Sequence, residues 1–258
     1  MSAQDSTVIS LRGVGKTFEN GTTALKGFDL DVRPGEFVSL LGSSGCGKST
    51  ALRIIAGLSP VSEGTVEWPT GAGQIGFVFQ EPTLMPWANI AANVALPLRL
   101  AHAGDTSSRA PAMQALKRVG LTEFADAFPR ELSGGMKMRA SIARALVIEP
   151  RLLLMDEPFA ALDEINRFKL NNDLLAVWKE LNRTVIFVTH SVFESVYLSQ
   201  RIVVMTPRPG RVFTEIAIDA PYPRDERFRT SGAYAGYCRR VSEALAQAMG
   251  ESATAERA

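Results

Sequence analysis

Four short runs of consecutive apolar residues stand out along the chain. They are FVSLLG from Phe37, RLLLMD around Leu153, TVIFVTH around Ile186 and RIVVM around Val203, and all are rich in Val, Ile, Leu or Phe. Runs of this kind, separated by segments with helical spacing, are typical of strands that are buried on both faces of a mostly parallel sheet. The pattern therefore predicts a buried sheet at the centre of the chain.

Helical spacing follows three of these runs, at residues 49–57, 167–181 and 192–198. The alternation of buried strands with helices predicts an α/β fold. After the last run, the segment MTPRPGRVFTEIAI predicts a turn at Pro209 and Gly210 that leads into a further strand.

The middle of the chain has a different pattern. From about residue 82 to 149 no strand is evident, and helical spacing occurs at residues 90–100, 112–119 and 134–148. Between the first two of these helices, HAGDTSSRAP is a polar segment that predicts a break. We therefore expect a main domain over residues 1–223, into which a helical subdomain is inserted at about 82–149. The tail, 224–258, predicts a weak helix at 234–249 and a frayed end.

Composition favours a globular protein of the cell interior. Of 258 residues 46% are apolar and 21% are charged, and the net charge of +1 does not indicate nucleic acid or a polybasic membrane anchor. The first ten residues lack the apolar core of a signal peptide, and no apolar run approaches the roughly 18 residues of a membrane span. Cys46 and Cys238 are far apart in sequence, which fits a reduced cytoplasmic setting. Any membrane role would then come through a partner.

Directly after the first apolar run, GSSGCGKST matches the phosphate-binding P-loop pattern. Glycines allow successive backbone N–H groups to point into one concavity, and the following helix adds its positive end. Lys48 can reach the β- and γ-phosphates, and the Ser49 hydroxyl can ligate Mg²⁺. The alternative is a chance match, which the strand–loop–helix context disfavours. The predicted nucleotide-binding residues here are Gly42, Ser43, Ser44, Gly45, Cys46, Gly47, Lys48, Ser49 and Thr50.

Two adjacent carboxylates end the second apolar run in LLLMDEP. Asp156 closes a buried strand, where an acidic side chain needs a cation partner, so it is the candidate to hold Mg²⁺. Glu157 is placed to polarise a water for in-line attack on a γ-phosphate. The alternative is an ordinary acidic turn after a strand.

Two polar residues end other apolar runs. His190 closes FVTH at the carboxyl end of a predicted parallel strand, where ligands gather in open α/β sheets. A lone histidine is more often structural, but at this position it can hydrogen-bond a γ-phosphate. Gln80 ends FVFQ, and its amide can reach a metal or a water, although by itself it is a weak signal.

The segment ELSGGMKMRASIARAL places Ser133, Gly134 and Gly135 before a helical pattern. One interpretation is a loop that ends at Ser133 as the helix N-cap. The other is that the bare backbone N–H groups at this helix start approach an anion.

Six motifs in order along the chain, GSSGCGKST, FVFQ, LSGGM, LLLMDEP, ALD and FVTH, resemble the ATP-binding cassette of ABC transporters over about Val8 to Asp219. The resemblance implies a P-loop NTPase fold with a mostly parallel core sheet, an antiparallel β subdomain and an inserted helical subdomain. It also implies ATP and Mg²⁺ as cofactors, with catalytic roles for Lys48, Glu157 and His190 and metal contacts for Ser49, Gln80 and Asp156.

In such cassettes the signature segment serves the ATP that is held by the opposite subunit. The resemblance therefore implies that Ser133, Gly134 and Gly135 face a γ-phosphate on a second copy, in a head-to-tail dimer that encloses two ATP molecules. Asp163, in ALD, resembles the residue that communicates across that dimer, and Phe18 resembles the aromatic residue that stacks on adenine.

Met136 departs from the family pattern, which usually has Gln as the fifth signature residue, so a ribose contact there is in doubt. LSGGM, MPWANIAANVALPL and VMTPRPGRV together resemble the ATPase subunits of nitrate, sulfonate and taurine importers. This subfamily also has members for pyrimidine precursors and aromatic acids.

Leu84, Met85 and Trp87 either pack the helical subdomain or form an apolar groove for a cytoplasmic helix of a permease.

The implied function is ATP hydrolysis that drives uptake of a small organic or inorganic anion. The expected partners are a second copy, separate transmembrane permease subunits and an extracytoplasmic substrate-binding protein, without nucleic acid. The expected location is the cytoplasmic face of the membrane, as a peripheral subunit. Export is an alternative, because a cassette does not set the direction of transport.

Two further classes compete with transport. A soluble ABC-type ATPase acting on DNA or ribosomes is disfavoured, because no long coiled coil separates Lys48 from Ser133 and only one cassette is present. A nucleotide-gated binding module without turnover is disfavoured by the presence of both Glu157 and His190.

Overall fold

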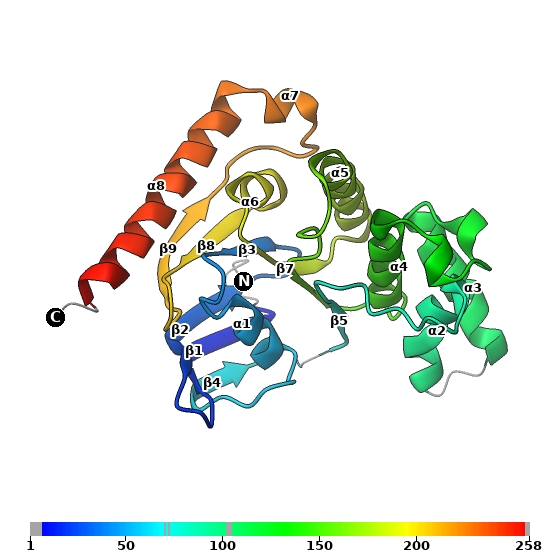
Figure 1. Ribbon diagram of the computed structural model, residues 1–258, viewed down its shortest axis with the longest axis horizontal. Coiled ribbons are helices and arrows are strands. Elements are labelled where there is room, and N and C mark those ends of the chain that lie inside the picture. The colour runs from blue at the N-terminus through cyan, green and yellow to red at the C-terminus, as the bar shows by residue number, and fades with distance from the viewer. Residues whose placement is uncertain (1–6, 70, 72, 102–104, 256–258) are drawn as a thin grey trace, which may run out of the picture. The chain divides into compact units, whose positions relative to one another are not determined.

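The computed structural model describes residues 7–69, 71, 73–101 and 105–255, whose helices and strands are labelled in Figure 1. The chain divides into two compact units. The first unit combines Met1–Ala72 with Thr184–Ala258, and the second is the continuous middle segment Gly73–Arg183. The predicted division into a cassette over 1–223 and a tail over 224–258 stays a prediction.

The first unit contains an antiparallel sheet with the strand order β2-β1-β4. Its strands are β1 (Ile9–Thr17), β2 (Thr23–Val32) and β4 (Glu63–Glu67). In the second half of β2, Phe28, Leu30 and Val32 are buried, and the residues between them are exposed. This alternation is typical of a sheet with one face on the core and one face toward solvent.

A second sheet supplies the core of the first unit, with the order β7-β3-β8-β9. β3 (Phe37–Leu41) pairs in parallel with β7 (Thr184–Thr189) and with β8 (Arg201–Met205). β9 (Val212–Ala217) joins β8 in antiparallel pairing after the predicted turn. Every residue of β3 and β7 is buried. Three of the four apolar runs lie in this sheet, so their prediction as buried strands is confirmed.

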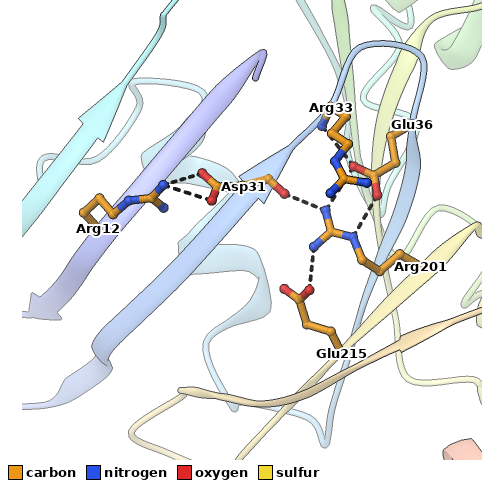
Figure 2. Close-up of polar contacts among 6 residues, drawn as sticks. All are labelled: Arg12, Asp31, Arg33, Glu36, Arg201 and Glu215. Carbon is orange, nitrogen blue, oxygen red and sulfur yellow. Dashed lines mark hydrogen bonds and ion pairs between the residues drawn. The ribbon is translucent and has the colours of Figure 1, made fainter. Parts of the chain in front are cut away.

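Arg201 at the start of β8 ties strands of both sheets together through its guanidinium group (Figure 2). It donates to Glu36 Oε1 at 2.7 Å, to Glu215 Oε2 at 2.9 Å and to the carbonyl oxygen of Asp31. Asp31 also accepts two hydrogen bonds from Arg12, at 2.8 and 2.9 Å. The Arg12–Asp31 pair is exposed and contributes little, whereas the Arg201 side chain is only 18% exposed and is less screened by water.

The helices of the first unit are α1 (Lys48–Ile55), α6 (Val192–Leu198), α7 (Glu226–Arg229) and α8 (Gly232–Ala255). The predicted helix at 234–249 is therefore part of a longer helix that continues to Ala255, and residues 256–258 lie outside the described residues, so the predicted frayed end stays a prediction. α8 packs against α6, β8 and β9. Buried Arg224 lies before it and donates to carbonyl oxygens at the end of α6, those of Val196, Tyr197 and Ser199. Because the last carbonyls of a helix lack partners within the helix, this contact anchors the tail to α6.

The second unit pairs β5 (Ile75–Val78) in parallel with β6 (Leu152–Asp156). Its helices are α2 (Ile90–Leu100), α3 (Asp105–Arg118), α4 (Gly134–Leu146) and α5 (Glu164–Leu181). Two short 3₁₀ turns, η1 (Thr122–Phe124) and η2 (Pro129–Glu131), connect α3 to α4. α2 packs against both α3 and α4. Between residues 82 and 149 the described chain is helical, in turns or irregular, without a strand.

The predicted break at HAGDTSSRAP is wrong over most of its length. α3 begins at Asp105 and continues through Pro111 to Arg118, and the first part of the segment, residues 102–104, lies outside the described residues. Asp, Thr and Ser favour helix starts because their side chains can accept from the orphan N–H groups of the first turn. A polar composition at this point was therefore compatible with a helix start as well as with a loop.

Among the residues that the structure describes, no helix combines the length and the apolar character that crossing a membrane requires.

Candidate functional site

The glycine-rich loop in the first unit joins the end of β3 at Leu41 to the start of α1 at Lys48. Gly47 precedes the helix with a φ of 107°, a conformation that residues with a Cβ rarely adopt. A Cβ at Gly47 would lie 2.7 Å from the carbonyl oxygen of Ala24, so backbone packing also excludes one. The loop therefore needs glycine at this position for its own conformation and for its contact with β2.

Lys48 lies inside this loop, and its side chain is almost fully buried, with 3% of the residue exposed. Its Nζ donates to the carbonyl oxygens of Gly42 and Ser43, both at 2.9 Å. The ammonium group is thus held on the concave side of the loop. Ser44 and Gly45 are exposed at the loop surface, Ser43, Ser49 and Thr50 are half-buried, and Cys46 is buried.

His190 lies next to the beginning of this loop. Leu41 of β3 and Thr189 of β7 are paired neighbours at the ends of two parallel strands, and Gly42 and His190 are the next residues. His190 is exposed, and the turn that follows it is held by Thr189, whose hydroxyl donates to Glu194 Oε2 at 2.6 Å. The structure therefore places His190 and the loop at the same carboxyl edge of the sheet.

Phe18 lies in the hairpin between β1 and β2 of the same unit. Its N–H donates to the Thr22 carbonyl at 2.9 Å, and its carbonyl accepts from the Gly21 N–H at 2.9 Å. The residue is 43% exposed, and Lys16 Nζ lies 5.5 Å from the ring centroid. The ring is thus an exposed aromatic surface on a hairpin of fixed conformation.

In the second unit, Gln80, Asp156 and Glu157 lie at one edge of the β5–β6 pair. Val78 pairs with Met155, so Asp156, the last residue of β6, and Gln80, two residues after β5, lie at the same end of the strand pair. Asp156 is 7% exposed, Glu157 is half-buried and Gln80 is exposed. Glu157 has a φ of 44°, a left-handed conformation that costs roughly 1–2 kcal/mol for a residue with a Cβ. Strain of this kind is concentrated at functional sites, and here it turns the chain sharply after Asp156.

The signature segment forms the N-terminus of α4, with Ser133 as the N-cap. Ser133 Oγ accepts from the Met136 N–H at 3.3 Å, as the first interpretation predicted. Ser133 and Gly134 are exposed, and Gly135 and Met136 are half-buried. The cap occupies one N–H group, so the exposed helix start remains compatible with an approaching anion.

Asp163 is the N-cap of α5, and its carboxylate accepts from Asn166 twice, from the backbone N–H at 3.0 Å and from Nδ2 at 2.6 Å. The hydrogen bond from the Asn166 backbone is the main cause that lowers the pKa of Asp163. Asp163 therefore has a local structural role within the single chain.

Sequence reasoning missed two residues that shape the segment after Gln80. Buried Asn93 of α2 donates from Nδ2 to the carbonyl oxygens of Met85 and Ala88, and accepts from the Met85 N–H at 2.6 Å. Arg144 of α4 donates to the carbonyl oxygens of Pro82 and Thr83, both at 2.8 Å. The available signal was a polar Asn within the apolar helix IAANVALPL, where an unpaired amide would be costly.

These contacts hold residues 82–89 in one conformation and present Trp87 to solvent, with 77% of it exposed. Leu84 and Met85 beside it are half-buried. Leu84 and Met85 are thus partly covered and Trp87 is an exposed apolar surface, and both interpretations given to this segment stay predictions.

Comparison with known proteins identifies the family. The model of the ABC transporter family matches residues 25–160. The aliphatic sulfonates import ATP-binding protein SsuB 1 of Pseudomonas syringae pv. syringae is 46% identical over 207 residues, which cover 80% of this chain and 84% of that protein. The taurine import ATP-binding protein TauB of Rhizobium johnstonii is 46% identical over 203 residues, which cover 76% and 77%.

A solved structure agrees with these relatives. The dimeric post-hydrolysis state of the ATP-binding cassette MJ0796 bound to ADP and Pi has a TM-score of 0.73 and 34% sequence identity, and the match covers 83% of this chain and all of that one. The chain therefore belongs to the ABC transporter family. It is an ATP-binding cassette with the P-loop NTPase fold, an ATPase of the kind that powers transport.

Proposed function

We propose that this cassette binds Mg²⁺·ATP at residues 42–50 and that hydrolysis drives uptake of a small anion through a separate permease. The observation that carries the proposal is the buried Lys48 ammonium, held on the concave side of a glycine-rich loop at the start of α1. Loop and helix N–H groups with a lysine form a site for phosphate oxygens. Phe18, in the same unit, supplies an exposed ring on which adenine stacks.

Mg²⁺ fits the residues that the proposal assigns to it. It binds through one or two carboxylates together with substrate phosphates and waters, rather than in a cage of protein ligands. In the described part of the chain no three His, Cys, Asp or Glu side chains form a preformed metal site, which is compatible with this mode of binding. We assign the metal contacts to Ser49, Gln80 and buried Asp156, and the ion would neutralise charge on the phosphates.

For hydrolysis we assign Glu157 as the base and His190 as a γ-phosphate ligand. Water attacks the γ-phosphorus, its proton passes to Glu157, and the bond to the β–γ bridging oxygen breaks, which gives ADP and inorganic phosphate. The strained backbone at Glu157 and the position of His190 beside the loop support these roles. Lys48 stabilises the negative charge on the phosphates.

We further propose that α4 completes the site of a second copy. Neither Gly134 nor Gly135 has a positive φ, and a Cβ at either would lie 3.5 or 3.8 Å from its nearest neighbour, an ordinary contact. Glycine is a poor helix former, so its presence at both positions has no explanation within the single chain. Close approach of a γ-phosphate from the partner supplies one, and the related MJ0796 cassette is dimeric. Asp163 would then act across the same interface.

The transported molecule is proposed from the named relatives, which import aliphatic sulfonates and taurine. Both names denote molecules that carry a sulfonate group, so we propose a sulfonate or a related small anion as the cargo, with nitrate as the inorganic member of the class. Permease subunits and an extracytoplasmic binding protein would recognise it. The cassette would lie at the cytoplasmic face, with exposed Trp87 and its neighbours against the permease.

A pull-down from gently solubilised membranes of the native host tests the transport proposal. The tagged chain should retain a polytopic permease, and the binding protein of that system should bind ethanesulfonate, taurine or nitrate in calorimetry. If the binding protein instead binds a pyrimidine precursor or an aromatic acid, the proposed identity of the transported molecule is wrong. Recovery of ribosomes or DNA without a membrane protein would contradict transport while leaving the ATPase assignment intact.

A further inference from the structure

The turn between β8 and β9 in the first unit is closed by its own hydrogen bonds. The Thr206 N–H donates to the Arg211 carbonyl at 3.0 Å, and the Arg211 N–H donates to Thr206 Oγ1 at 3.0 Å. Thr206 Oγ1 in turn donates to the Pro209 carbonyl at 3.2 Å. Residues 206–211 therefore form a compact structure that can support a neighbouring segment.

This turn packs directly against the glycine-rich loop. A Cβ at Gly210 would lie only 2.1 Å from the carbonyl oxygen of Cys46, so no side chain fits between turn and loop. On its other side Gly210 is fixed to β2, because its N–H donates to the Ala24 carbonyl at 2.8 Å and its carbonyl accepts from the Lys26 N–H at 3.2 Å. The turn is thus held in place independently of the loop.

Arg208 extends from this turn to the middle of the loop. Its Nε and Nη2 both donate to the carbonyl oxygen of Gly45, at 3.1 and 3.0 Å. Gly45 has a φ of 76° and is exposed at the loop surface. Glycine is the residue with the greatest backbone freedom, so a contact on this carbonyl oxygen restricts the orientation of the peptide group.

The orientation of that peptide group decides where the next N–H points. In a planar trans peptide the C=O of Gly45 and the N–H of Cys46 point in opposite directions. The Cys46 N–H donates to the Ser43 carbonyl at 3.3 Å, the same oxygen that accepts from Lys48 Nζ at 2.9 Å. With Arg208 on the outer oxygen, the Cys46 N–H thus points to the concave side, where the lysine ammonium lies.

We propose that Arg208 is a positioning residue for nucleotide binding, which orders the Gly45–Cys46 peptide so that its N–H faces the phosphates. The inference rests on the proposed phosphate site at residues 42–50. Arginine suits the role because its planar fork places two donors on one oxygen, whereas a lysine donates from a single flexible group. Loss of this contact would leave the loop to be ordered by the nucleotide itself, which weakens binding.

Titration calorimetry of the full chain with Mg²⁺·ATP and with ADP tests the proposal. Arg208→Ala should bind both nucleotides about tenfold more weakly, since one hydrogen-bonded charged contact is lost. Its KM for ATP should rise by about the same factor, with kcat nearly unchanged. Arg208→Lys should recover about half of the lost binding free energy, as one donor of the two is restored.

Two controls separate positioning from other effects. Arg211→Ala removes an equal charge from the same turn, and the Arg211 side chain has no hydrogen bond to the loop within the described part of the chain, so binding should match that of the unmodified chain. The melting temperature of Arg208→Ala without nucleotide should fall by less than about 2 °C, as for an exposed substitution.

Several outcomes would overturn the role of Arg208. They are unchanged affinity in Arg208→Ala, equal weakening in Arg211→Ala, or a fall in kcat without a change in KM. A large loss of stability without nucleotide would also overturn it, because the contact would then be structural. Lys48→Ala tests the phosphate site separately: if that variant binds ATP normally, the proposed site is wrong whatever Arg208 does.

Discussion

The glycine-rich loop at residues 42–47 and the start of α4 use glycine for different reasons. At Gly47 the single chain demands it, because φ is 107° and a Cβ would lie 2.7 Å from the Ala24 carbonyl. At Gly134 the backbone is helical and a Cβ would meet only Leu162 Cδ2 at 3.5 Å among the described residues. Since the conformation and packing of the single chain do not require glycine at Gly134, we look for the reason in a contact with another molecule. The comparison thus separates a loop whose glycine the chain itself explains from a helix start for which we propose a contact with a second copy.

The largest effect is expected at the loop. Gly47→Ala forces a Cβ into the Ala24 carbonyl and places a non-glycine residue at a φ of 107°. We expect a loss of about 2–4 kcal/mol in the free energy of unfolding and no measurable ATP binding. Chemical denaturation and calorimetry check both. Normal stability in this variant would show that the loop can relax around a Cβ. It would contradict the claim that the single chain requires glycine at Gly47.

Glu157→Gln should remove turnover without removing binding. The amide keeps the size of the carboxylate but cannot accept the proton of the attacking water, so steady-state hydrolysis should fall about a thousandfold. The affinity for Mg²⁺·ATP should stay within about twofold of the unmodified value. A phosphate-release assay beside calorimetry separates the two quantities. Full turnover would contradict the assignment of the base.

Gly134→Glu tests the second half of the comparison. The single chain has room for a Cβ at this exposed position, and a carboxylate near a helix N-terminus is favourable, so stability should stay equal or rise by about 0.5 kcal/mol. In the dimer the same carboxylate would repel the γ-phosphate of the partner, and hydrolysis should fall about a hundredfold. Gly232→Glu is a matched control at the start of α8, where a Cβ would have no described atom within 4 Å, and its activity should be unchanged.

The smallest effect concerns Asp163. Hydrogen bonds from Asn166 lower its pKa in the folded chain, so its contribution to stability is present above the unfolded pKa and is lost as the pH falls through the folded value. Asp163→Asn should therefore weaken the acid dependence of the melting temperature slightly below about pH 4. Melting curves from pH 3 to pH 7 measure it. An unchanged acid dependence would show that the cap does not contribute.

The sequence predicts most of this fold because the relevant signals are local. Buried strands such as β3 and β7 are continuous apolar runs, and α6 has the predicted bounds because Ser191 caps it and Leu198 ends its apolar face. The helix start at Asp105 was missed, since cap residues and loop residues have the same composition. The composition of a short polar segment therefore does not distinguish a helix start from a loop.

The parts of the site that could be predicted are those whose residues are neighbours in sequence, because a short motif then determines the local backbone geometry. The loop at residues 42–50 is such a motif, and Ser133 was recognised as a possible cap. Asn93, Arg144 and Arg208 were not predicted, because each binds backbone carbonyls. Those of Arg144 and Arg208 are far along the chain, and those of Asn93 lie within eight residues of it. A backbone carbonyl is present at every residue, so contacts of this kind leave no spacing in the sequence.

Sedimentation velocity of Glu157→Gln and of the double variant Glu157→Gln/Gly134→Glu, each with saturating Mg²⁺·ATP, tests the central claim most directly. The single variant should sediment as a dimer, because ATP is bound but not hydrolysed. The double variant should bind ATP and sediment as a monomer. A double variant that dimerises as well as the single variant would show that Gly134 does not face a partner, and would contradict the account.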